Sequence, residues 1–77
     1  MYFTKDEVIE LNDNKKYLVL DTTIINDVVY YKIKEVENEN VIGNELYITT
    51  EIKDGKIYIN DKLSEELIKL IQEKFQS

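Results

Sequence analysis

The chain has 77 residues and a formal net charge of −6, from 16 acidic residues against 10 lysines, with no arginine. It contains no cysteine, histidine, proline or tryptophan, which excludes disulfides and removes the commonest general base and metal ligand. Nucleic-acid binding normally requires a basic surface rich in arginine, so direct binding to nucleic acid or to anionic membranes is not expected.

The length predicts one small β-rich domain over residues 1–77, with strands within about residues 7–60 and one helix over about residues 64–76. The start "MYFTKDEVIEL" carries acids where the apolar region of a signal peptide would lie. No apolar run approaches the roughly 20 residues needed to span a bilayer. We therefore expect a cytoplasmic protein, and its abundant Ile, Lys, Asn and Tyr are typical of AT-rich bacterial and phage genomes.

The first half of the chain predicts three strands. Residues 7–11 form a short strand, and the turn-forming residues 12–14 follow it. Residues 16–25 form the second strand, because β-branched and aromatic side chains dominate there. The pair Asn26-Asp27 suits a two-residue hairpin turn that leads into a third strand over residues 28–36.

This turn sets the register of the second and third strands. The predicted cross-strand pairs are Ile25–Val28, Thr23–Tyr30, Asp21–Lys32 and Leu20–Ile33. One face then carries Leu18, Leu20, Ile24, Val29, Tyr31 and Ile33, and the other carries Tyr17, Val19, Ile25, Val28, Tyr30 and Val36. Both faces are largely apolar, so we expect one to form the core and the other to be either a surface strip or an interface.

The second half predicts a polar connection over residues 37–44 and a fourth strand over residues 45–53, which alternates cleanly. Asp54-Gly55 is a strong signal for a type I′ turn and leads into a fifth strand over residues 56–60. Outward positions in this register include Tyr47 and Tyr58.

The C-terminal segment predicts a helix. Ser64 is the expected N-cap, and Glu65 and Glu66 follow in the first turn, where the helix dipole favours acids. The apolar stripe consists of Leu67, Ile68, Leu70, Ile71 and Phe75. This stripe must pack on the sheet, so the predicted fold is α+β: a five-stranded antiparallel meander, strongly curled or barrel-like, with one C-terminal helix.

Catalytic and metal-binding patterns are scarce. Ser64 and Ser77 are the only serines, and no histidine or cysteine is present to activate them. Glu35, Glu37 and Glu39 alternate and have the oxygen chemistry that suits Ca²⁺, but a solvated strand end and loop is the strongly favoured explanation. The sequence has neither an EF-hand pattern nor a phosphate-binding glycine loop. We therefore expect a protein that is not an enzyme and that has no cofactor or metal.

The run "DEVIELNDNKKYLVLDTTIINDVVYYKI" resembles a pattern in short acidic proteins of Gram-positive bacteria and their phages. In these proteins a "V-x-L-x-DGKKY-x-V-L-D" hairpin precedes a tyrosine-led strand, an acidic loop and a final helix. The matching residues are Val8, Leu11, Lys15, Lys16, Tyr17, Val19, Leu20, Asp21 and Tyr31, whereas "NDNKK" lacks the turn glycine. The resemblance covers about the first half of the chain and implies a hairpin-rich fold, without assigning a ligand or catalytic residue.

The leading functional hypothesis is a small non-enzymatic protein-interaction module that binds another protein or a second copy of itself. The predicted patch is Tyr17, Val19, Ile25, Val28 and Tyr30, on the outer face of the second and third strands. The alternative is an acidic phage-type inhibitor that imitates nucleic acid on a host enzyme, which the net charge of −6 suggests.

Overall fold

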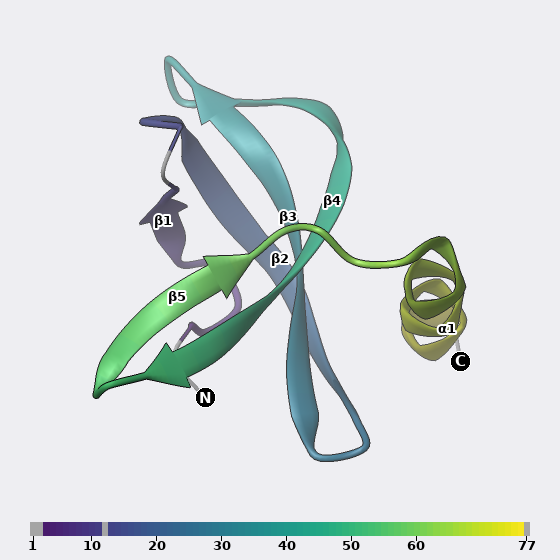
Figure 1. The fold of residues 1–77 in the computed structure, drawn as a ribbon. Coiled ribbons are helices and arrows are strands. Elements are labelled where there is room, and N and C mark those ends of the chain that lie inside the picture. Colours follow the sequence, from purple (N-terminus) through teal and green to yellow (C-terminus); the bar gives the residue numbers. More distant parts are fainter. Residues whose placement is uncertain (1–2, 12, 77) are drawn as a thin grey trace.

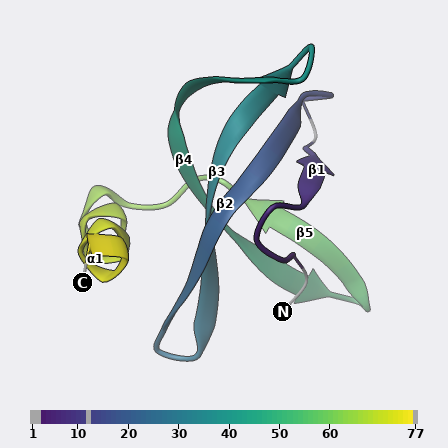
Figure 2. The same cartoon turned by 180° about the vertical axis from the view of Figure 1, so that it is seen from behind.

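A computed structural model describes residues 3–11 and 13–76, so Asn12 of the predicted first turn lies outside the described residues. Antiparallel strands follow one another in the sheet order β1-β2-β3-β4-β5, and a helix follows them (Figure 1). The elements are β1 (Val8–Glu10), β2 (Lys16–Ile25), β3 (Val28–Glu37), β4 (Asn40–Lys53), β5 (Lys56–Asn60) and α1 (Glu65–Gln76). The sheet curls into a half-barrel, which confirms the predicted α+β meander (Figure 1 and Figure 2).

Three hairpin turns of two residues each connect β2 to β5. Both residues of each turn have positive φ: Asn26 (50°) and Asp27 (67°), Asn38 (52°) and Glu39 (67°), Asp54 (52°) and Gly55 (75°). This is the backbone geometry of a type I′ turn, whose twist matches the flanking strands. The first and last turns confirm the prediction, but the predicted polar connection over residues 37–44 is wrong. Because the middle turn already closes the hairpin, residues 40–44 belong to β4.

A β-bulge at Leu20 changes the predicted register of the first long hairpin. The pairs Ile25–Val28, Thr23–Tyr30 and Asp21–Lys32 form as expected, but Ile33 lies opposite Val19 instead of Leu20. The extra residue reverses the alternation of side chains in the first half of β2. Tyr17 and Val19 therefore point to the same face as Tyr31 and Ile33.

That concave face holds the main core. Its buried side chains are Ile9, Tyr17, Val19, Tyr31, Ile33 and Ile48, with Phe3, Leu11, Val29 and Ile59 packed around them. Phe3 meets Tyr31 edge-on, with the ring centroids 5.2 Å apart. The curling of the sheet brings β1 and β5 into this cluster through Ile9 and Ile59, so the apolar interior is covered largely by the sheet itself.

Helix α1 covers part of the opposite, convex face (Figure 1). Tyr47 stacks on Phe75 with the ring centroids 6.3 Å apart, and Lys32 places its ammonium 4.8 Å from the centre of the Phe75 ring. Tyr30 and Ile71 are buried. The Ser64 hydroxyl accepts a hydrogen bond from the Leu67 N–H at 3.2 Å, which confirms the predicted N-cap.

Thr49 is the buried polar residue on the convex face, and its hydroxyl donates a hydrogen bond to the Val29 carbonyl at 2.7 Å, as a buried hydroxyl requires. The part of the chain that the structure describes contains no helix with the length and apolar character needed to cross a membrane.

Two isoleucines on the concave side differ in burial, so the same change to valine should affect the free energy of unfolding unequally at the two positions. Ile33→Val removes a methylene from a fully buried site and should lower the free energy of unfolding by about 1 kcal/mol. Ile52→Val is the matched control at an exposed position of β4 and should change it by less than about 0.5 kcal/mol. Urea denaturation measures both, and equal effects would contradict this core assignment.

Candidate functional site

The residues predicted as an interaction patch (Tyr17, Val19, Ile25, Val28 and Tyr30) do not share one exposed face. Tyr17, Val19 and Tyr30 are only 5%, 0% and 8% exposed. Ile25 is partly buried, and Val28 remains exposed beside the tip of the β2–β3 hairpin. The predicted face assignment is wrong because the bulge in β2 turns Tyr17 and Val19 into the concave core, while α1 covers the sheet around Tyr30.

The exposed feature with the clearest binding geometry is instead an unpaired edge of β4. On one side, β4 pairs with β3 over residues 40–42 and 46–49, with a shift in register between these two stretches. On the other side, its pairing with β5 covers only Thr49 to Lys53, because the chain leaves β5 after Asn60 and continues towards α1. Within the described residues, β4 before Thr49 therefore has a neighbouring strand on one side only. Such an edge presents backbone N–H and C=O groups that another strand can pair with.

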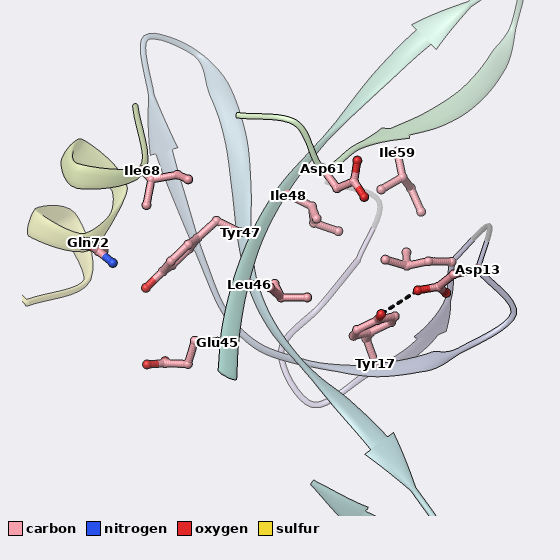
Figure 3. Close-up of a pocket in the computed structure, with 11 residues that line it drawn as sticks. Asp13, Tyr17, Glu45, Leu46, Tyr47, Ile48, Ile59, Asp61, Ile68 and Gln72 are labelled. Atoms are coloured by element: carbon pink, nitrogen blue, oxygen red, sulfur yellow. Dashed lines mark hydrogen bonds between the residues drawn. The ribbon is translucent and has the colours of Figure 1, made fainter. Parts of the chain in front are cut away.

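A groove of about 380 Å³ lies along this edge. Four consecutive residues of β4 line it, Glu45, Leu46, Tyr47 and Ile48, although neighbouring side chains on a strand point to opposite faces. Figure 3 shows Leu46 and Ile48 on the side of Tyr17, and Tyr47 on the side of α1. The groove therefore follows the edge of the strand and occupies the position that another strand beside β4 would take.

The remaining walls come from four other parts of the chain. They are Leu11 and Asp13 beside the β1–β2 connection, Tyr17 on β2, Ile59 and Asp61 at the end of β5, and Ile68 and Gln72 on α1. The β1–β2 connection and β5 form the wall on the concave side, and α1 forms the wall on the convex side (Figure 3). The groove thus has apolar walls with polar groups at its margins, which is the usual composition of a binding site.

Tyr17 and Asp13 form a fixed polar pair at one margin. The Tyr17 hydroxyl donates a hydrogen bond to Asp13 Oδ2 at 2.7 Å, and the Lys15 backbone N–H donates to Asp13 Oδ1 at 2.9 Å. The Lys15 N–H and then the Tyr17 hydroxyl lower the pKa of Asp13, because both hydrogen bonds stabilise its charged form. The bond to Asp13 and burial raise the pKa of Tyr17 to about 12. At neutral pH, Tyr17 is therefore a protonated donor and Asp13 is a carboxylate.

Glu45 lies on the other side of the groove from Asp13 and Tyr17. Its carboxylate lies 3.2 Å from Lys32 Nζ, and the same ammonium lies over the Phe75 ring. Lys32 is thus held between Glu45 of β4 and Phe75 of the helix. This contact links the groove to the packing of α1.

The alternating acids predicted as a calcium-site alternative do not converge on a metal site. Glu35 forms an ion pair with Lys15 at 3.8 Å, whereas Glu37 ends β3 and Glu39 lies in the following turn. The described residues 3–11 and 13–76 contain no cluster of three or more Asp or Glu side chains arranged to hold a metal ion.

Searches of protein-family models, curated proteins and solved structures found no match to this chain. The resemblance to short acidic proteins of Gram-positive bacteria and their phages remains a prediction from the residues quoted above.

Sequence reasoning missed the groove because the predicted lengths of the fourth strand (residues 45–53) and the fifth strand (residues 56–60) were not compared, although they already leave residues 45–48 without a partner on that side. The available signal was the difference in strand length: β4 has 14 residues and β5 has 5, so part of β4 must lack a partner on that side. Reading Asn38-Glu39 as a tight turn would have extended β4 to Asn40 and enlarged this mismatch.

The hydrogen bond between Asp13 and Tyr17 predicts that a substitution at Tyr17 shifts the pKa of Asp13. Tyr17→Phe removes one donor to the Asp13 carboxylate and should raise the pKa of Asp13 towards 3.8, whereas Tyr58→Phe should not. The pKa of Asp13 is measured by NMR titration of its carboxyl carbon. An unchanged Asp13 pKa in Tyr17→Phe would contradict the hydrogen bond.

The Asp13–Tyr17 pair also determines how the stability of the protein changes with pH. Because folding lowers the pKa of Asp13, its ionised carboxylate contributes stability above the unfolded value of about 3.8, and this contribution is lost as the pH falls through the folded pKa. Asp13→Asn should therefore be less stable than the parent at neutral pH, and the difference should shrink in acid.

Proposed function

We propose that this protein is a small non-enzymatic interaction module that receives an extended segment of a partner protein along the unpaired edge of β4. The observation that carries the proposal is the groove beside Glu45, Leu46, Tyr47 and Ile48, at a place where β4 has no second neighbouring strand among the described residues. Adding a strand to a free sheet edge is a common mode of peptide recognition, in which backbone hydrogen bonds give affinity and alternating side chains give specificity.

The chemistry of the groove favours binding over catalysis. Tyr17 has its hydroxyl bonded to Asp13 and a pKa of about 12, so it does not act as a base near neutral pH. The chain has no histidine or cysteine to serve as an alternative base or nucleophile. We also propose that the protein is located in the cytoplasm.

Binding at this edge predicts that two similar substitutions on β4 have different effects. Leu46 is 45% exposed inside the groove, and Ile52 is 59% exposed on the same side of the strand but outside the groove. The probe is a phage-displayed library of random dodecapeptides, and the enriched peptides are measured by fluorescence anisotropy. Leu46→Asp should weaken their binding by about tenfold, a loss of about 1.4 kcal/mol, and Ile52→Asp should leave it unchanged.

Circular dichroism of both variants serves as the folding control. A library that yields no groove-dependent peptide, or equal losses in the two variants, would rule out this site.

A second candidate is self-association through the outer edge of β5. Its sequence, Lys-Ile-Tyr-Ile-Asn, has the same apolar pattern in both directions about Tyr58, and Ile57 and Tyr58 are each about half exposed. Two copies paired antiparallel about Tyr58 would place Ile57 of each opposite Ile59 of the other, as a two-fold interface requires. The pairing would continue the sheet across both molecules.

Self-association predicts that the solution mass rises above 9.2 kDa towards twice that value as the concentration increases. Ile57→Lys should keep the mass at the monomer value, because it places a charge in the shared apolar row, and Ile24→Lys at another exposed isoleucine should not. Size-exclusion chromatography with light scattering measures the mass. A constant monomer mass for the parent chain would exclude this candidate.

The acidic-inhibitor alternative remains a prediction from net charge. Exposed acids occur on separate parts of the surface, such as Glu10 on β1, Asp27 in a hairpin turn, Glu51 on β4 and Glu66 on α1. Acidic side chains distributed in this way account for solubility. These four do not form a single row that would imitate the phosphates of a nucleic acid.

A further inference from the structure

We propose that the segment received by the β4 groove is basic: a short extended stretch with apolar side chains in its middle and lysine or arginine towards both ends. This inference rests on the proposed function and names the chemistry of the partner. It is carried by the charges that line the groove, by the position of its apolar side chains, and by the unpaired backbone beside them.

The ionised side chains that line the groove are all acidic. They are Asp13, Glu45 and Asp61, and no lysine is among the lining residues that the structure describes. Figure 3 shows Asp13 and Asp61 on the same side of β4 as Tyr17, whereas Glu45 lies on the side of α1. A ligand that spans the groove therefore meets negative charge on both sides.

Each of these carboxylates keeps capacity for a cation. Asp61 and Asp13 are exposed, and both bonds of Asp13 come from neutral donors, the Tyr17 hydroxyl and the Lys15 N–H. Glu45 already contacts Lys32, but its side chain is also exposed to solvent. Arginine and lysine side chains are long enough to extend from a strand in the groove to these margins.

The middle of the groove is apolar on both sides of the strand edge. Leu46 lies on the concave side, where Leu11 packs against the core, and Ile68 and the ring of Tyr47 lie on the helix side. Side chains of an added strand alternate between these two sides, so apolar residues in its middle would pack against both walls. The four β4 residues along the groove match a central segment of about four residues.

Charge argues against a second copy of this chain as the occupant of the groove. Each copy carries a net charge of −6 and would bring its own acids to the carboxylates of the groove. Like charges brought together oppose association, and a basic segment gains favourable encounter rates from the same field. Self-pairing remains assigned to the outer edge of β5, which is a different surface.

The test uses three blocked hexapeptides that differ only in charge. The basic probe is Lys-Val-Leu-Val-Ala-Lys, whose middle residues place apolar side chains on both sides, and the others carry glutamine or glutamate in place of both lysines. Each is titrated into isotopically labelled full-length protein, and the backbone amides of residues 45–48 are followed by NMR. The basic peptide should bind about fivefold more tightly than the glutamine peptide, since each exposed charge pair contributes only modestly, and the glutamate peptide should bind weakest.

Two matched variants locate the charge effect. Asp61→Asn and Asp54→Asn each remove one negative charge, but only Asp61 lines the groove. Asp61→Asn should reduce the preference for lysine over glutamine about twofold, and Asp54→Asn should leave it unchanged. The preference should also shrink at about 0.5 M salt, because salt screens exposed charges.

The outcomes separate this inference from the proposed function. Equal binding of the lysine and glutamine peptides at residues 45–48 would overturn the basic preference and leave the strand-edge site intact. Amide shifts confined to other parts of the sheet, or no binding by any peptide, would overturn both. A lysine preference that Asp61→Asn and Asp54→Asn reduce equally would show a general field effect and would also overturn the inference.

Discussion

The β-bulge at Leu20 is the local feature on which the core of this protein depends. Without it, regular alternation would place Tyr17 and Val19 on the opposite face from Tyr31 and Ile33. With it, these four side chains share the concave face, where all are buried. A bulge also increases the local twist of a strand, which helps the sheet to curl. The packed interior and the curvature thus have a common cause.

The two-sided hydrophobicity of the β2–β3 hairpin follows from this arrangement. The concave side forms the core, and the convex side around Tyr30 lies beneath α1 together with Thr49. The helix is held there by Ile71 and by the contacts of Phe75 with Tyr47 and Lys32. An apolar outer face therefore did not imply an intermolecular interface, because the chain covers much of it with its own C-terminal helix.

The same use of the C-terminal segment leaves β4 incompletely paired. A longer β5 would extend the ladder beside β4, but the chain turns away after Asn60 to place α1 on the convex face. The groove lies between this departing segment, the β1–β2 connection and the helix. The groove is a consequence of topology. The edge of β4 stays unpaired because the chain leaves β5 to place α1 on the convex face of the sheet.

Local sequence determined the elements with short-range causes. Alternating β-branched residues specified the strands, Asn26-Asp27 and Asp54-Gly55 specified two hairpin turns, and Ser64 specified the start of the helix. These signals act between residues that are close in the sequence, so they could be read without knowing the fold. The five-stranded meander with a C-terminal helix followed from them.

Tertiary structure decided which apolar side chains are buried and where the surface stays open. The Leu20 bulge, the turn at Asn38-Glu39 and the side of the sheet covered by α1 had weak local signals, and each moved residues to a different environment. The predicted patch failed for this reason, and the groove beside Leu46 was not foreseen. Strand edges and faces become exposed or covered only when distant segments pack, because burial depends on the whole arrangement and periodicity describes one strand at a time.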